Sequence, residues 1–157
     1  MRAQRCVQGR FLGGRSPYGY RLVDAGAHPN QAHARWGRRV HRLEPDPATA
    51  PWVRWIFEQR AAGRSVARIA WELNERGVPC PSGADRMRNP HRCGQAWIVR
   101  TVVGITESPR YTGRQVWNRH GTDHGAGAAR RAGGAGRRTD AHKWAVSETL
   151  DHPALGQ

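Results

Sequence analysis

Residues 51–79, PWVRWIFEQRAAGRSVARIAWELNERGVP, predict two consecutive helices that decide the fold. The apolar residues of the first half recur at helical spacing, namely Trp52, Val53, Ile56, Phe57 and Ala61. Those of the second half stand at i, i+3, i+4 and i+7, namely Val66, Ile69, Ala70 and Leu73. Gly63 is typical of a helix C-terminal cap and Ser65 of an N-cap, so we expect the helices to be joined through Gly63 and Arg64 only.

Two helices joined by a glycine turn are typical of a helix-turn-helix, whose second helix commonly lies in a DNA major groove. A rotation of 100° per residue places five residues opposite the apolar stripe, namely Arg64, Arg68, Trp71, Glu72 and Glu75. Arg68 and Trp71 are therefore outward candidates for contact with DNA. An ordinary helical hairpin stays open as an alternative, because Glu72 and Glu75 would repel phosphates and can pair with arginines.

The flanking segments predict a small α+β domain. Period-two alternation indicates strands at residues 18–23 and 39–45, which form a hairpin with a long loop, and we expect Tyr18 and Tyr20 to pack. The helix entry is expected at Asp46 and Pro47. A third helix is expected from about Trp97 to Ile105, followed by a helix stop at Pro109 and a closing strand within 108–119, in which Tyr111 and Trp117 are expected in the core.

The charge of the chain makes nucleic acid the first partner to consider. The chain has 157 residues and a formal net charge of +14, and Lys143 is its single lysine, so nearly every cation is an arginine. Guanidinium groups suit phosphates and guanine edges. Arginine-rich composition can also follow from codon bias, and this remains the alternative explanation of the excess of basic over acidic residues.

Several classes of protein are not indicated. Three cysteines without a C-x-x-C pair favour neither a disulfide framework nor a zinc site, although Cys80, His91 and Cys93 can be imagined as ligands. No cofactor is expected. The sequence has no 18-residue apolar run and no apolar core of a signal peptide, so we expect a cytoplasmic, nucleoid-associated protein that neither spans a membrane nor takes a small-molecule substrate.

Three motifs, taken in order, resemble a known family. They are GGRSPYGYRL (13–22), the helix pair with its flanks, and WIVRTVVGITESPRYTGRQVWNR (97–119). Their order and spacing resemble the recombinase domain of the large serine recombinases, which include phage integrases and transposon-borne site-specific recombinases. The resemblance covers roughly residues 9–120, and residues 142–155 are similar to the segment that lies directly after this domain in some members.

The resemblance implies a domain organisation in which DNA binding and catalysis belong to different domains. Residues 1–9 would be the remnant of an interdomain linker, 10–120 the DNA-binding recombinase domain, 121–143 a flexible Gly/Ala/Arg linker, and 144–157 the truncated start of a following segment. In this family an N-terminal catalytic domain carries the serine nucleophile in a Tyr-x-Arg-x-Ser motif. No such motif occurs here, so we expect a truncated protein that does not cut DNA by itself.

The expected partners are double-stranded DNA and, by the resemblance, other recombinase subunits. Six arginines are the candidate DNA contacts, namely Arg15, Arg21, Arg64, Arg68, Arg110 and Arg114. The main alternative is a stand-alone helix-turn-helix regulator, which would be a dimer on a palindromic site. An RNA-associated protein and an independent enzyme are further alternatives, for which the sequence offers neither an RNA-binding aromatic motif nor a nucleophile, metal cluster or phosphate loop.

Overall fold

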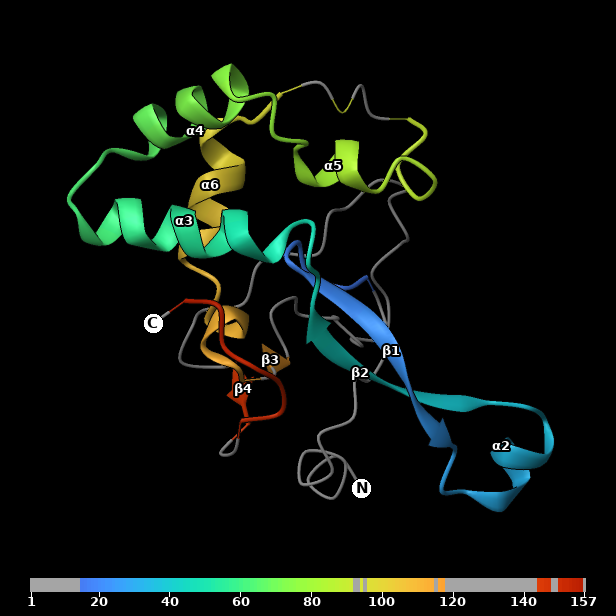
Figure 1. Cartoon of the computed structure of the whole chain (residues 1–157). Helices are drawn as coiled ribbons and strands as arrows, with labels where there is room; N and C mark the ends of the chain where they lie inside the picture. Colours follow the sequence, from blue (N-terminus) through green and yellow to red (C-terminus); the bar gives the residue numbers. More distant parts are fainter. Residues whose placement is uncertain are drawn as a thin grey trace, which may run out of the picture.

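The described residues form a two-stranded arm, a layer of helices and a second, short two-stranded sheet (Figure 1). The computed structural model describes residues 15–91, 94, 96–114, 116–117, 144–147 and 150–156. The elements in chain order are β1 (Tyr20–Ala27), α2 (Gln31–Arg35), β2 (Arg39–Pro45), α3 (Ala50–Ala61), α4 (Val66–Glu75), α5 (Pro81–Ala84), α6 (Val99–Thr106), η1 (Pro109–Thr112), β3 (Val116–Trp117) and β4 (Ala145–Val146). The predicted α+β class is confirmed.

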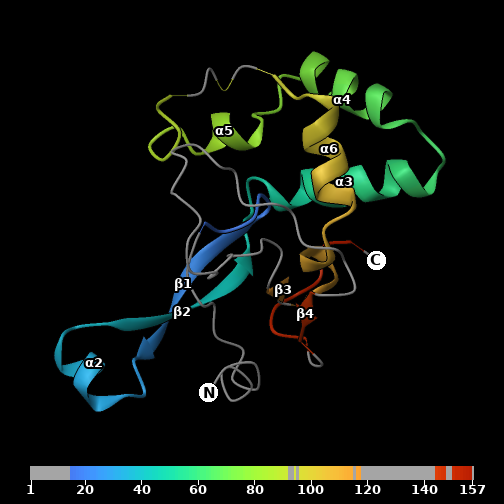
Figure 2. The same ribbon diagram turned by 180° about the vertical axis from the view of Figure 1, so that it is seen from behind.

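Strands β1 and β2 form the predicted antiparallel hairpin. Tyr20 lies opposite Pro45 and Leu22 opposite Leu43, with an irregularity of the register between Asp24 and Ala27. The long loop between the strands contains the short helix α2, which accounts for its length. Figures 1 and 2 show this hairpin projecting away from the helices as an arm, with α2 at its far end.

Helices α3 and α4 form the predicted pair. Gly63 adopts a left-handed φ of 81° after α3, and the Ser65 hydroxyl accepts a hydrogen bond from the Arg68 amide at 3.2 Å, as an N-cap should. Helix α3 begins at Ala50, later than expected, because both carboxylate oxygens of Asp46 accept hydrogen bonds in a preceding turn, from the Ala48 amide and the Thr49 hydroxyl.

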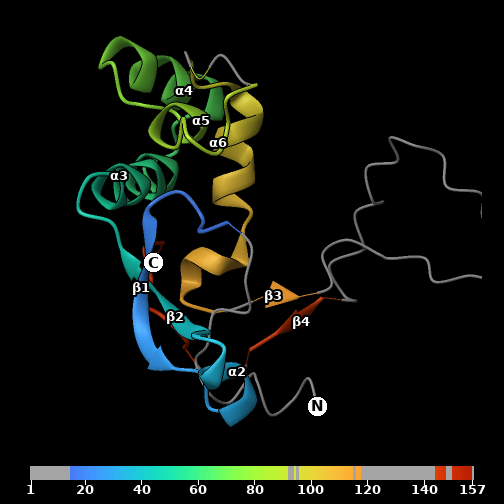
Figure 3. The same cartoon turned by 90° about the vertical axis from the view of Figure 1, so that its right-hand side faces the viewer.

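Helix α6 packs against both helices of the pair, as Figure 3 shows from the side. It begins at Val99, two residues after the expected start at Trp97. The reason is that the Asn74 side chain holds both backbone groups of Trp97: its oxygen accepts from the Trp97 amide at 2.7 Å, and its nitrogen donates to the Trp97 carbonyl at 3.0 Å. Trp97 therefore serves as an anchor in front of the helix.

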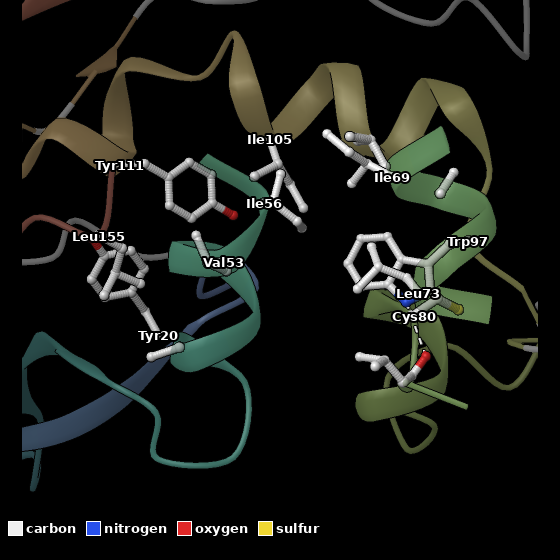
Figure 4. Packing of buried hydrophobic residues seen from close by; sticks show 14 of the residues in the cluster. Tyr20, Val53, Ile56, Ile69, Leu73, Cys80, Trp97, Ile105, Tyr111 and Leu155 are labelled. Atoms are coloured by element: carbon white, nitrogen blue, oxygen red, sulfur yellow. Dashed lines mark hydrogen bonds between the residues drawn. The ribbon is translucent and has the colours of Figure 1, made fainter. Parts of the chain in front are cut away.

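The apolar core lies where the helices meet the base of the arm (Figure 4). Its largest fully buried side chains are Val53, Ile56, Ile69, Leu73 and Val102. Trp97 is also buried, and its indole nitrogen donates a hydrogen bond to the Val78 carbonyl at 2.9 Å. Burial of each large apolar side chain contributes about 1.5–3 kcal/mol to folding. The residues of the predicted helical stripes thus form this core.

Leu155 of the C-terminal segment 150–156 packs into the same core. Leu155 is buried, and its amide donates to the Tyr111 carbonyl at 2.9 Å. The closing strand is confirmed at Val116–Trp117, and its partner is β4, where Val116 lies opposite Val146. The expected domain boundaries stay a prediction, and the linkers proposed at 1–9 and 121–143 lie outside the described residues.

Tyr20 and Tyr111 are buried, as predicted from the sequence, and Tyr18 packs against the core. The side chain of Trp117 is not among those described. Within the described ranges, no helix has both the length and the apolar character needed to cross a bilayer.

Replacement of Gly19 by alanine should destabilise the fold. Gly19 has a φ of +89°, and an added Cβ would lie 2.6 Å from Val53 Cγ2. The left-handed backbone and the overpacking together cost about 2–5 kcal/mol. Gly26→Ala is the matched control, because Gly26 has a φ of +107° with no atom near the added Cβ, and it should lose only about 1–2 kcal/mol. Urea unfolding measures both, and equal losses would contradict the close packing at Gly19.

Mild acid should weaken the fold through His152. Burial lowers the pKa of this imidazole, against smaller opposing effects of its hydrogen bond to the Arg110 carbonyl and of the Asp151 carboxylate. The ring nitrogen Nε2 lies 2.7 Å from that carbonyl, and Nδ1 has no hydrogen-bond partner among the residues that the structure describes. Because the unfolded chain then binds more protons, stability should be complete above pH ~6.5 and fall as the pH drops below it.

The measurement is the melting temperature between pH 7.5 and 5, values chosen to bracket the ordinary histidine pKa of about 6.5. His152→Gln should reduce the dependence on pH, whereas His41→Gln, at an exposed position of β2, should leave it unchanged. A wild-type protein that becomes more stable on acidification through this range would contradict the assignment.

Candidate nucleic-acid interface

Helix α4 carries a nearly buried carboxylate surrounded by three arginines. The side chain of Glu72 is only 11% exposed. Its Oε1 accepts hydrogen bonds from Arg64 Nη1 and, at 3.1 Å, from Arg68 Nε, and its Oε2 lies 3.9 Å from Arg76 Nη2. Arg68 and Arg76 stand one helical turn before and after Glu72, and Arg64 comes from the turn between the helices. We call Arg64, Arg68 and Arg76 around Glu72 the arginine cluster.

The guanidinium groups of the arginine cluster remain accessible to a partner. The side chains of Arg64, Arg68 and Arg76 are 46%, 57% and 49% exposed. A guanidinium has five N–H donors. Arg64 and Arg68 each use one of them in a hydrogen bond to Glu72, and Arg76 is held at ion-pair distance. Three positive charges share one negative charge, so the cluster keeps an excess of two. It therefore presents oriented cationic donors to solvent.

Two tryptophans hold the outer arginines in place. The Cζ atom of Arg68 lies 4.4 Å from the centre of the Trp71 ring, and that of Arg76 lies 4.7 Å from the Trp55 ring. Such cation–π contacts contribute about 0.5–1 kcal/mol at exposed sites. Trp71 is itself 50% exposed. The ring of Trp71 thus extends the surface of the cluster along α4.

The prediction that Glu72 faces outward is wrong. Arg68, Trp71 and Glu75 are exposed as predicted, but Glu72 is buried because the surrounding arginines cover it. Sequence reasoning also missed Arg76 as a member of the cluster. The sequence does contain a signal for it: Arg68 and Arg76 stand four residues before and after Glu72, the spacing at which oppositely charged side chains pair on a helix.

Arg15 and Arg21 lie on other parts of the chain. Arg15 donates to the Asn89 side chain at 2.6 Å and to the Arg88 carbonyl at 2.7 Å, so it fastens the segment before β1 to the loop after α5. Arg21 lies on β1, 3.8 Å from the Glu44 carboxylate, with more than half of its side chain exposed. Their predicted roles at DNA stay predictions.

Arg110 and Arg114 are half-buried near the C-terminal segment. Arg114 Nη1 donates to the Ser147 carbonyl at 2.7 Å, and the Arg110 carbonyl lies 2.7 Å from a ring nitrogen of His152. Arg114 therefore holds the segment at Ser147, and the Arg110 backbone holds it at His152. Of the six predicted arginines, the structure brings only Arg64 and Arg68 together.

A groove of about 1080 Å³ lies along the start of β1 and the segment around α5. It is lined by residues of both charges, among them Arg15, Arg88, Asp46 and Asp85, so it does not favour an anion as the arginine cluster does. Cys80 in its wall is buried. In the part of the chain that the structure describes, no three histidine, cysteine or acidic side chains gather where they could hold a metal ion.

Glu72→Gln should lower stability although it preserves the size of the side chain. The three arginines would lose their shared counter-charge, and because each is about half exposed we expect a loss of only about 1 kcal/mol. Glu75→Gln is the matched control on the exposed face of α4 and should change stability by less than about 0.5 kcal/mol. Urea unfolding at low salt measures both. A Glu72→Gln variant as stable as wild type would contradict the role of Glu72 in holding the arginines.

Comparison with known proteins identifies the family. The family model described as Recombinase matches residues 47–155, which is more than half of the chain. No curated protein and no solved structure matches. The match includes the helix pair with the arginine cluster, helix α6, and Leu155, which packs into the core. The chain belongs to the Recombinase family, as its motifs predicted.

Proposed function

We propose that this chain is the DNA-binding module of a site-specific serine recombinase and holds attachment-site DNA during recombination and integration. The observation that carries the proposal is the arginine cluster on α4, within the residues that match the Recombinase family. A surface with an excess of two guanidinium charges beside an exposed tryptophan suits the phosphates of a duplex.

The buried carboxylate of Glu72 lowers the entropy that the arginines lose when they bind phosphate. An arginine that binds phosphate from a mobile state loses side-chain entropy worth about 1.5–2 kcal/mol. Glu72 and the tryptophan rings already restrict Arg64, Arg68 and Arg76, so less entropy remains to be lost on binding. Since Glu72 offsets one charge of three, the cluster still releases counterions from DNA.

Sequence reading would come from the exposed side of α4. In a helix-turn-helix the second helix enters the major groove, where arginine pairs with the O6 and N7 atoms of guanine. Arg64 and Arg68 lie at the start of α4 and its preceding turn, the part of such a helix that commonly meets base edges. We therefore assign base contacts to Arg64 and Arg68 and phosphate contacts to Arg76.

Strand cleavage would belong to another part of the recombinase, and other recombinase subunits would be further partners of this chain. The places of four of the five serines support the assignment of cleavage to another part. Ser65 caps α4, Ser108 and Ser147 are buried, and the Ser82 hydroxyl lies 3.3 Å from the Cys80 thiol. None of these positions offers an exposed hydroxyl beside a general base, which a serine nucleophile needs.

Arg64→Ala/Arg68→Ala should weaken binding to duplex DNA. We expect wild-type affinity in the micromolar range or weaker for a single module. The double variant should lose affinity because each arginine–guanine pair contributes about 1–3 kcal/mol, and its logarithmic salt slope should change little because the slope counts contacts to phosphates. Fluorescence anisotropy with a labelled duplex at several salt concentrations measures this.

The charge-matched control is Arg54→Ala/Arg100→Ala, which removes two exposed arginines from α3 and α6. This control should retain most of the affinity and slope. Equal losses in the two double variants would show that only net charge matters and would contradict the assignment to the cluster. A wild-type affinity that does not change with salt would contradict DNA binding through phosphates altogether.

A further inference from the structure

The tip of the hairpin arm has the chemistry of a second binding surface. We define the tip as residues 28–38, which join β1 to β2 and include α2. The tip has no buried residue, and Figures 1 and 2 place it at the end of the arm, away from the helices. The eight residues of β1 span about 26 Å at 3.3 Å per residue. The tip is therefore held well away from the core.

An exposed tryptophan stands between two exposed arginines at this tip. Trp36 is 71% exposed, and Arg35 and Arg38 on either side of it are exposed as well. The guanidinium carbon of Arg38 lies 6.0 Å from the centre of the Trp36 ring. A large aromatic side chain left in water contributes little to folding, so most of the Trp36 ring is available to a partner.

The positive charge of the tip is not neutralised along the arm. Residues 25–38 contain no aspartate or glutamate. The nearest carboxylates already have partners, because Asp24 pairs with Arg39 and Glu44 pairs with Arg42 at 2.7 Å. The excess charge of the arm therefore concentrates at Arg35 and Arg38, which makes an anionic partner the complementary one.

Contacts within the tip hold its residues in a defined arrangement. The rings of His28 and His33 meet edge to face at 4.8 Å, and those of His33 and Trp36 at 5.5 Å. The Asn30 side chain caps α2 by accepting from the Ala32 amide at 2.9 Å. A hydrogen bond of 3.1 Å from the His28 amide to the Arg38 carbonyl closes the loop. Trp36 and its flanking arginines thus stand on a defined scaffold.

We propose that this tip is a second contact to the same duplex that the arginine cluster binds, with Arg35 and Arg38 at phosphates and Trp36 against the sugars of a groove edge. The proposal rests on the proposed function. An arm of about 26 Å covers most of one turn of B-DNA, which is about 34–36 Å. The tip can therefore reach backbone that the helices leave uncovered. The arm precedes the matched residues 47–155, so it adds a contact outside them.

Duplex length separates the two contacts. On a duplex of about 10 bp, one helical turn, the arginine cluster alone has room to bind, whereas about 30 bp accommodates both surfaces. Arg35→Ala/Arg38→Ala should lose about tenfold in affinity on the long duplex, with a salt slope smaller by about two, and should match wild type on the short one. Trp36→Ala should likewise weaken binding to the long duplex only. Fluorescence anisotropy with both duplexes measures these effects.

The controls match charge and exposure. Arg54→Ala/Arg100→Ala removes the same charge from the helices, and Met87→Ala removes another exposed apolar side chain, which is 92% exposed. Neither control should show a loss confined to the long duplex. Circular dichroism should show all variants folded, because every substituted side chain is exposed.

The outcomes distinguish this inference from the proposed function. If wild type binds neither duplex, the proposed function and the tip contact fail together. If wild type binds both and the tip variants bind the long duplex equally well, the tip contact is overturned while the proposed function stands. If Trp36→Ala instead dissociates a dimer in sedimentation and leaves DNA affinity unchanged, the tip is a protein interface and the proposal is overturned.

Discussion

The contact between Tyr20 and Tyr111 joins parts of the chain that are far apart in sequence. The two rings stack at 5.9 Å between centroids. The Tyr20 hydroxyl donates to the Pro153 carbonyl at 2.7 Å, and the Tyr111 hydroxyl donates to the Tyr18 carbonyl at 2.9 Å. Burial raises the pKa of Tyr20 to about 12, so this phenol stays a neutral donor. The base of the arm, the end of the helical layer and the C-terminal segment are thus fixed to one another, which sets how the arm leaves the core.

The arginine-rich composition leads to repulsion between neighbouring cations, which Glu72 reduces only in part. With 26 basic and 12 acidic residues, the chain cannot pair its cations one to one. Complete pairing on α4 would also abolish attraction to phosphate, whereas three unpaired guanidinium groups would repel one another. One nearly buried carboxylate shared among Arg64, Arg68 and Arg76 lies between these limits. The same arrangement that permits folding leaves the cationic surface on which the proposed function rests.

The sequence predicted the elements whose determinants are local and missed those that depend on distant contacts. Helical periodicity and the Gly63 and Ser65 caps were sufficient for the helix pair, and strand alternation for the hairpin. No local pattern could show that Arg15 would bind Asn89, which is 74 residues away, or that Arg114 would bind the Ser147 carbonyl, 33 residues away. The same distinction applies to the candidate site. The positions of Arg64 and Arg68 follow from the helix pattern, whereas the burial of Glu72 depends on how the surrounding arginines pack against it.

The arm and the helical layer differ in how their positions are determined. The arginine cluster is held by side-chain contacts within and beside α4, whereas the tip is placed by the register of β1 on β2. An irregularity of that register, as between Asp24 and Ala27, increases the local twist of a strand pair. The direction in which Trp36 faces therefore depends on the middle of the arm as well as on its base. Two separately positioned surfaces can follow a curved DNA backbone better than one flat surface, which is consistent with the proposed division of the DNA contact between the cluster and the tip.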